Sequence, residues 1–386
     1  GRVQVRLETP GDAELAVRWR LAAKSQPDAG LALYEGEDER FFMMTVAPPK
    51  EVKPAAIPPR EIAFVLDVSC SMRGYPLDVA KTVMKESLQR LRPSDRFNVL
   101  FFAGSGWALA ESPLAASPEN VERALREVSK QQGGGGTQLV GALASVAKLP
   151  RAEGRARSVV VVTDGLVSFE KRAFAKVREK LEDATLFTLG IGNNVNRMLV
   201  EGLARAGGGT SHVAHDQDGA QKEAERLVQA MGAPVLTDLA LDIEGLDAYD
   251  LEPPTLPDLY ADRPVVVVGK YRGEAKGTLR FSAHAADRSV VRTLRAGEAQ
   301  ASDTNAALRA LWARRRLMRV ADDRALADGG ADEAAITALG LKYGLLTKHT
   351  AFVAVDSEGG RAQGGKRSVE QPAPHPKGMR SEEHTS

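Results

Sequence analysis

Five oxygen-bearing side chains stand where apolar stretches of the sequence give way to polar loops. Two are carboxylates and three are hydroxyls, and oxygen ligands of this kind select hard cations. A small set that leaves room for water suits Mg²⁺ or Mn²⁺ better than Ca²⁺, which prefers a larger oxygen cage. Two carboxylates match the charge of a dication, but they need not contact the ion directly. A coordination position is then left for one more anionic oxygen, which an Asp or Glu of a protein partner would supply. The five residues are Asp67, Ser69, Ser71, Thr137 and Asp164.

Four of these residues follow segments that the apolar pattern predicts to be buried strands, and the fifth, Thr137, follows a glycine run whose loop is expected to converge on the same edge. Apolar runs of strand length alternate with stretches in which apolar residues recur at helical spacing. One such helix begins behind Ser117 as N-cap, with Pro118 in the first helical position. The alternation predicts an α/β fold with a doubly wound, mostly parallel sheet, in which ligands bind outside the carboxyl ends of the strands. The predicted strands are 62–66, 97–103, 159–162 and 186–191.

The order of the polar motifs resembles the metal-ion-dependent adhesion site (MIDAS) of von Willebrand factor type A (VWA) domains. The resemblance covers residues 61–232, which contain a D-x-S-x-S pattern, a threonine after a glycine run, and a Thr-Asp-Gly turn. It implies that the two serines, and in some states the threonine, bind the metal directly, while the aspartates often act through water. In this chain these residues are Ser69 and Ser71, Thr137, and Asp67 and Asp164.

Segments on both sides of this domain are predicted to be rich in β structure. Strand-like stretches separated by Pro and Gly occur in residues 1–48 and again in residues 233–300. A Pro-rich linker at 49–60 joins the first of these segments to the α/β domain. C-terminal helices and a closing strand are expected within 301–356, and residues 357–386 form a tail without apolar periodicity that we expect to be disordered.

The order of these segments resembles that of bacterial relatives of inter-alpha-trypsin inhibitor heavy chains, in which a so-called VIT domain precedes the VWA domain. The stretches LGLKYGLL at 339–346 and FVAV at 352–355 carry this part of the resemblance. Residues 1–48 are then either the remnant of a VIT domain or strands that pack with residues 234–300. The DPHF-type sequence by which some animal heavy chains couple to glycosaminoglycan is absent, so that activity is not expected here.

The composition excludes several classes of function. The 52 Lys and Arg residues balance 51 Asp and Glu residues, so the net charge of +1 gives no general attraction to nucleic acid. No apolar run reaches the roughly 20 residues that a membrane helix needs. The single cysteine, Cys70, rules out an intrachain disulfide. Cys70 stands where many VWA domains carry glycine. We expect its side chain to alter the affinity of the loop for the metal, and we expect no catalytic role for the thiol.

Both ends of the sequence indicate a piece of a longer protein. The chain opens on Gly1 within a strand-like alternation. Its last seven residues, 380–386, resemble the in-frame translation of a sequencing adapter. We therefore expect that the complete protein could carry a signal peptide or an anchor beyond this stretch.

Motifs of several enzyme classes are incomplete. A haloacid dehalogenase-type phosphatase needs a second aspartate where Ser69 stands, and a cysteine-based phosphatase needs an arginine where Pro76 stands. The glycine run lacks the lysine of a phosphate-binding loop, and no G-x-S-x-G elbow occurs. His212 and His215 are spaced so that a short edge strand turns them to different faces, which disfavours a second metal site. The arginine run at 314–316 is expected to form the solvated side of a helix.

The sequence therefore favours a binding protein over an enzyme. The main hypothesis is a cell-envelope or secreted adhesion protein whose Mg²⁺ or Mn²⁺ binds an acidic side chain of a protein partner, with no nucleic acid and no membrane insertion of its own. The alternative is an intracellular assembly factor or chelatase-like accessory protein, in which the same site docks an ATPase.

Overall fold

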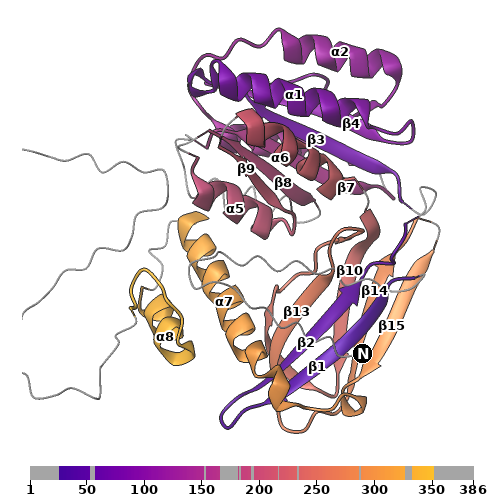
Figure 1. The fold of residues 1–386 in the computed structure, drawn as a ribbon. Coiled ribbons are helices and arrows are strands. Elements are labelled where there is room, and N and C mark those ends of the chain that lie inside the picture. Colours follow the sequence, from indigo (N-terminus) through magenta and orange to yellow (C-terminus); the bar gives the residue numbers. More distant parts are fainter. Residues whose placement is uncertain are drawn as a thin grey trace, which may run out of the picture. The chain divides into compact units, whose positions relative to one another are not determined.

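The structure of the protein, a computed structural model, contains an α/β domain, a β sandwich and two helices that follow them along the chain (Figure 1). The chain divides into units 1–350 and 351–386, and all described residues except Ala351 belong to the first. The strand expected at 352–355, the tail at 357–386 and the strand-like stretch before residue 26 lie outside the described residues. Those described are 26–52, 57–151, 154–165, 181, 184–192, 195–215, 217–232, 234–286, 288–326 and 333–351.

A mostly parallel sheet forms the centre of the α/β domain, as the alternation of strands and helices predicted. Its strands run in the order β5-β4-β3-β7-β8-β9, and the short strand β6 pairs with the first two residues of β4. The four pairings between β4 and β9 are parallel, whereas β5 folds back antiparallel on β4. The strands are β3 (Arg60–Asp67), β4 (Arg96–Phe102), β5 (Gly106–Ala108), β6 (Leu114–Ala115), β7 (Ala156–Thr163), β8 (Thr185–Ile191) and β9 (Ser211–Ala214).

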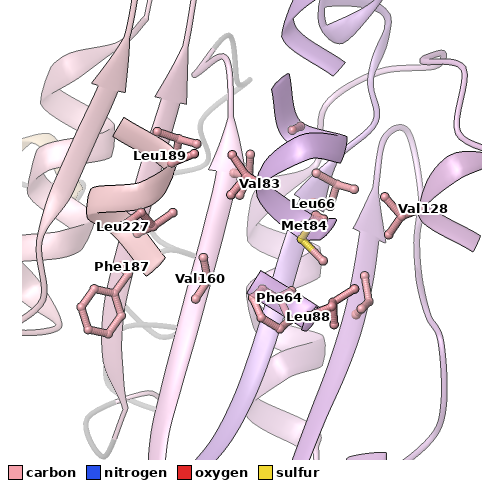
Figure 2. Packing of buried hydrophobic residues seen from close by; sticks show 14 of the residues in the cluster. Phe64, Leu66, Val83, Met84, Leu88, Val128, Val160, Phe187, Leu189 and Leu227 are labelled. Carbon is pink, nitrogen blue, oxygen red and sulfur yellow. The ribbon is translucent and has the colours of Figure 1, made fainter. Parts of the chain in front are cut away.

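Helices cover both faces of this sheet, so its central strands β3 and β7 are buried along their whole length. Figure 2 shows side chains of α1, α2 and α6 packed on one face, against residues of β3, β7 and β8 such as Phe64 and Val160. The expected N-cap of α2 is confirmed, because the Ser117 hydroxyl accepts a hydrogen bond from the Asn120 N–H. The helices are α1 (Tyr75–Gln89), α2 (Pro118–Ser129) and α6 (Gln217–Ala230) on this face, with α3 (Leu139–Lys148) and α5 (Arg197–Ala206) on the other.

Two antiparallel sheets form the sandwich, and each has four strands. The first sheet has the order β1-β2-β13-β11 and the second the order β12-β10-β14-β15. An apolar core lies between them. The strands are β1 (Asp28–Glu35), β2 (Arg40–Ala47), β10 (Pro234–Glu244), β11 (Asp247–Glu252), β12 (Leu259–Tyr260), β13 (Val265–Arg272), β14 (Thr278–His284) and β15 (Ser289–Arg295), and short 3-10 turns lie at Ala296–Glu298 and Asp303–Asn305.

Strand β2 pairs with β13 over seven residue pairs, from Val46↔Val265 to Arg40↔Tyr271. The chain before the α/β domain and the chain after it therefore share one sheet, and the α/β domain is inserted between two parts of the sandwich. Of the two arrangements that the sequence left open for residues 1–48, the described strands take the second, in which they pack with residues 234–300.

Both faces of the β2–β13 pair are buried. Val265 and Val267 face the sandwich core, while Val266 and Val268 face the helices α7 (Ala307–Leu326) and α8 (Glu333–Tyr343). Trp312 of α7 packs on Phe41 with a ring-centroid distance of 6.0 Å. The helices therefore close the second face of this sheet, which explains the unbroken apolar run in β13.

The expectation for the arginine run in α7 was wrong for two of its three residues. Arg314 is exposed, but Arg315 donates to the carbonyl oxygen of Val266, and Arg316 pairs with the buried carboxylate of Glu252 at 2.8 Å. Long side chains on the rim of a helix can reach across to a neighbouring sheet with their charged ends. The run therefore fastens α7 to the sandwich.

Buried contacts join the α/β domain to the sandwich at the amino ends of the sheet strands. Arg60, the first residue of β3, donates to the carbonyl oxygens of Met231 and Gly232 at 3.3 and 3.0 Å, and it pairs with the fully buried Asp95. Tyr260 of the sandwich is fully buried in the α/β core, with its hydroxyl 3.2 Å from that of Ser158. The two parts are thus packed as one body.

Candidate metal centre

The loop after β3 folds around the carboxylate of Asp67. Asp67 is the last residue of β3 and is fully buried, and its Oδ1 accepts a hydrogen bond of 2.9 Å from the Ser69 backbone N–H. Such an Asx turn lets the chain reverse tightly after a strand. It brings the hydroxyl oxygens of Ser69 and Ser71 to 3.2 Å from each other. Ser69 is buried and Ser71 is exposed, so this hydroxyl pair leads from the interior to the surface.

Strand β7 supplies a second set of polar groups beside the first. The hydroxyl of Thr163, at the end of β7, donates to Asp67 Oδ2 at 2.7 Å and accepts from the Gly165 N–H at 2.9 Å. The next residue after Thr163 is Asp164, whose side chain is also largely buried. Gly165 has φ +78°, and a Cβ there would lie 2.8 Å from the backbone nitrogen of Asn196, so only glycine fits this turn.

The glycine loop closes over the same edge of the sheet. The N–H of Gly134 donates to the carbonyl oxygen of Val68 at 2.8 Å, and the N–H of Cys70 donates to that of Gly135 at 3.2 Å. Gly133 and Gly135 have φ of +77° and +78°, which confirms that the run provides backbone freedom. Thr137 follows in this loop and is half-buried.

The electrostatics of the site disfavour two negative charges without a cation. Burial raises the pKa of Asp67 above its ordinary value, and the charge of Asp164 raises it further, while hydrogen bonds from Ser69 and Thr163 oppose this effect. Two carboxylates that lie close together in a poorly solvated site repel each other. A dication between them would remove this repulsion.

The donor set fits a hard divalent cation. Ser69, Ser71, Thr137, Asp67 and Asp164 are the residues that would hold it, and all of their donor atoms are oxygens. Within the part of the chain that the structure describes, no three His, Cys, Asp or Glu side chains are grouped so as to hold a metal by themselves. A metal at this site would therefore depend on the hydroxyl oxygens and on water beside the two aspartates.

The structure brings four of the five predicted residues to the carboxyl ends of β3 and β7, and Thr137 lies in the glycine loop that is hydrogen-bonded to the loop after β3. Hydrogen bonds connect Asp67, Ser69 and Ser71, and the charge of Asp164 acts on Asp67. The motif pattern assigned no role to Thr163, although this residue directly precedes Asp164. Its position as the last residue of β7, directly before Asp164, was the available signal.

The two histidines considered for a second metal lie in different surroundings. The Nδ1 atom of His212 is 3.1 Å from Glu223, and burial lowers the pKa of His212. His215 lies beside Arg197, with 3.1 Å between its Nε2 and an arginine nitrogen. Each imidazole thus has its own neighbour, and Asp216 lies outside the described residues.

Replacing Cys70 by glycine is expected to leave the affinity for Mn²⁺ unchanged or to increase it. The Cys70 side chain is exposed, and the backbone N–H that holds the glycine loop is present in either residue. The cost in stability should be no more than about 1 kcal/mol, from the greater backbone freedom of glycine. Calorimetric titration of the two proteins with Mn²⁺ measures the difference, with Ser71→Ala as the variant expected to lose affinity. A clear loss of affinity in Cys70→Gly would show that the thiol takes part in the site.

Known proteins resemble this chain both in the α/β domain and in segments outside it. Residues 60–213 match the family model of the von Willebrand factor type A domain. Inter-alpha-trypsin inhibitor heavy chain H3 of Homo sapiens is 26% identical over 225 residues, which cover 55% of this chain and 25% of that protein. Heavy chain H3 of Bos taurus is 24% identical over 329 residues, which cover 78% of this chain and 37% of that protein. The chain thus spans between a quarter and two fifths of the length of these relatives.

Two solved structures share the fold over most of the chain. A von Willebrand factor type A protein from Catenulispora acidiphila superimposes with a TM-score of 0.56 at 16% identity, covering 83% of this chain and 91% of that one. The ArnB paralog VWA2 from Sulfolobus acidocaldarius gives a TM-score of 0.52 at 16% identity, covering 83% and 89%. In the described part of this chain, none of the helices combines the length and apolar character required to cross a bilayer.

Proposed function

The chain contains a von Willebrand factor type A domain and is related to inter-alpha-trypsin inhibitor heavy chains, and we propose on this basis that it is a metal-dependent binding protein. Its site would hold Mg²⁺ or Mn²⁺ and bind an Asp or Glu side chain of a protein partner. The proposal assigns no catalytic step to the site. The order of the motifs in the sequence and the geometry at the carboxyl edge of the sheet both support it.

The observation that carries the proposal is the pair of buried aspartates beside a pair of hydroxyls that opens to the surface. Asp67 is fully buried and Ser71 is exposed, and the hydroxyl of Ser69 bridges the distance between them. A structural role alone does not explain why two carboxylates share a poorly solvated place, because each raises the energy of the other's ionised form. A dication bound at the site would relieve this repulsion, which supports the proposal.

The residues of the chain hold the site in position before a partner arrives. Both oxygens of Asp67 are occupied by donors from the chain, the Ser69 N–H and the Thr163 hydroxyl, so the carboxylate has one orientation. The hydroxyls of the buried Ser69 and the exposed Ser71 lie within hydrogen-bond distance of each other. A bound Mg²⁺ would supply a positive centre with places for water. A partner carboxylate replaces such a water and gains a charge-assisted contact that an amide does not match.

The expected result is that partner binding requires both the divalent ion and one carboxylate. A pull-down from surface extract of the source cell, run with Mg²⁺ and again with EDTA, supplies candidate partners. Binding of a purified candidate should be lost in the protein carrying Ser69→Ala and Ser71→Ala together. It should also be lost when one particular Asp or Glu of the candidate becomes its amide. Surface plasmon resonance on the purified pair measures both losses.

A control variant and the contrary outcomes show whether the loss of binding is specific to the metal site. The Leu341→Ala variant changes an exposed side chain of α8 and should bind as the wild type does. A candidate that binds equally well in EDTA, or to the double serine variant, shows that recognition lies outside the metal site. We propose a role in the cell envelope or outside the cell. If the Mg²⁺-dependent partner is an ATPase, the result would instead support an intracellular accessory role.

A further inference from the structure

Large apolar side chains lie exposed on both flanks of the metal site. Among the described residues, six large apolar side chains are exposed, and two of them, Trp107 and Met198, lie near the carboxyl edge of the α/β sheet. Their exposed fractions are 45% and 49%. Exposed aromatic and Met side chains are enriched in protein interfaces, whereas single exposed Leu or Val residues are ordinary.

The strand pairing fixes the distance of Trp107 from the site. Asp67 is paired with Phe102 across β3 and β4, and Phe102 is paired with Gly106 across β4 and β5. Trp107 is the next residue along β5, so it lies two strand spacings from Asp67, or about 10 Å. One face of its ring stacks on Phe101, with 5.4 Å between the centroids. This contact holds the indole in place while nearly half of its surface stays exposed.

Met198 lies on the opposite flank of the site, in the first turn of α5. The N-cap of this helix, Asn196, is packed against Gly165, which directly follows Asp164. Leu199, the neighbour of Met198, is buried in the core between α5 and the sheet. The helix therefore has a fixed rotation, and it presents Met198 to solvent beside the loop of Asp164.

The charged side chains around the site suit an acidic partner. Arg73 follows the metal loop and is exposed, with its Nε donating to the carbonyl oxygen of Gly133 at 3.0 Å. Arg197 begins α5 and lies against His215 at the carboxyl end of β9. The two aspartates of the site, in contrast to Arg73, are buried. A partner segment thus meets both cationic and exposed apolar side chains at this edge of the sheet.

We propose that Trp107 and Met198 determine specificity by contacting apolar residues on either side of the partner's acidic residue. The occupant would be an extended polypeptide segment, in which each residue advances about 3.3 Å along the chain. Over the 10 Å or so from Asp67 to Trp107, about three residues fit. The segment therefore carries a large apolar residue about three positions from its acid. This inference rests on the proposed function, because the acid is the residue that the metal would bind.

A peptide display library tests the inference with a defined probe. The peptides carry a fixed central Asp with random residues around it, and a second library carries Asn in its place. Both are selected on the whole protein in Mg²⁺ and in EDTA. The expected result is that Asp peptides are recovered only in Mg²⁺, with Leu, Ile, Phe, Met or Trp about tenfold enriched near the third position from the Asp, as a contact worth roughly 1.4 kcal/mol would give.

Matched variants separate recognition from folding. Trp107→Ala is expected to remove the apolar preference, Trp107→Phe to keep much of it through a ring that still stacks on Phe101, and Leu341→Ala to change nothing. Melting curves of the three proteins show whether the domain is folded. Recovery of Asp peptides in Mg²⁺ without an apolar preference, or with one that persists in Trp107→Ala, overturns this inference and leaves the proposed function standing. Equal recovery of the Asp and Asn libraries overturns both.

Discussion

The Asp67→Asn protein is expected to lose about half or more of the stabilisation that Mg²⁺ gives to the wild type. At a hundredfold excess of Mg²⁺ over its Kd, binding to the folded state alone contributes about 2.7 kcal/mol. For a chain of this size that corresponds to several degrees in Tm. The amide has nearly the shape of the carboxylate but carries no charge, and Asp67 is the residue that organises the loop through Ser69 and Thr163. Loss of a group that orients metal ligands typically lowers metal affinity about 10- to 100-fold.

Scanning calorimetry in Mg²⁺, in Mn²⁺ and in EDTA measures this effect directly. The wild type should melt at a higher temperature in either ion than in EDTA. The variant should show a much smaller difference, because a 10- to 100-fold weaker Kd leaves only about 0.4–1.4 kcal/mol of the stabilisation at the same ion concentration. Glu127→Ala provides a matched control, since Glu127 lies in an exposed ion pair with Lys130 on α2. A wild-type melt that does not respond to either ion would falsify the proposed metal site.

Replacing Asp95 by alanine is expected to lower the free energy of unfolding by about 3–5 kcal/mol, the usual cost of breaking a buried ion pair from one side. Asp95 is fully buried and accepts hydrogen bonds from the side chains of Arg60 and Arg92. Alanine would leave the guanidinium of Arg60, which is also buried, without its counter-charge. Urea unfolding of both proteins at pH 7 measures the difference. Glu127→Ala again serves as the exposed control, and its unfolding curve should stay close to that of the wild type.

The contribution of Asp95 also has a definite dependence on pH. Its hydrogen bonds and ion pairs with Arg60 and Arg92 outweigh the opposing effect of burial and hold the pKa of Asp95 below its ordinary value. A carboxyl group whose pKa is lowered by folding stabilises the protein above its unfolded pKa of about 3.9, and this contribution is lost as the pH falls through the folded pKa. The gap in stability between wild type and variant should therefore narrow below about pH 4. A gap that is small at pH 7 and grows in acid would contradict this account.

The sequence was sufficient to predict the α/β domain because its signals are local. The central parallel strands contain apolar runs of strand length, and the D-x-S-x-S and Thr-Asp-Gly motifs directly follow two of these runs. Parallel strands place their carboxyl ends on one edge, so the grouping of Asp67 and Asp164 follows from topology alone. The contribution of Thr163 was not predicted, because only the pairing of β3 with β7 shows that its hydroxyl reaches Asp67.

The rest of the fold depends on contacts between distant parts of the chain, which periodicity does not report. Strands β2 and β13 are separated by more than two hundred residues, yet they are neighbours in one sheet. Arg316 also depends on a distant contact. Its place in a charged run predicts a solvated side chain, but it pairs with Glu252 of β11. In both cases the partner lies in another element, so the sequence around the residue carries no sign of it.

The insertion of the VWA domain into the sandwich has a mechanical consequence. Two chain crossings connect the domain to the sandwich, and Arg60 binds them together at Met231 and Gly232. A third attachment lies apart from them, where Arg205 of α5 forms a two-pronged ion pair of 2.7 and 2.8 Å with Asp322 of α7. The domain is thus attached at two separate places, and two attachments restrict its rotation more than either one alone. If a partner binds at the proposed metal site, a force applied through it would therefore be transmitted to the sandwich and to α7.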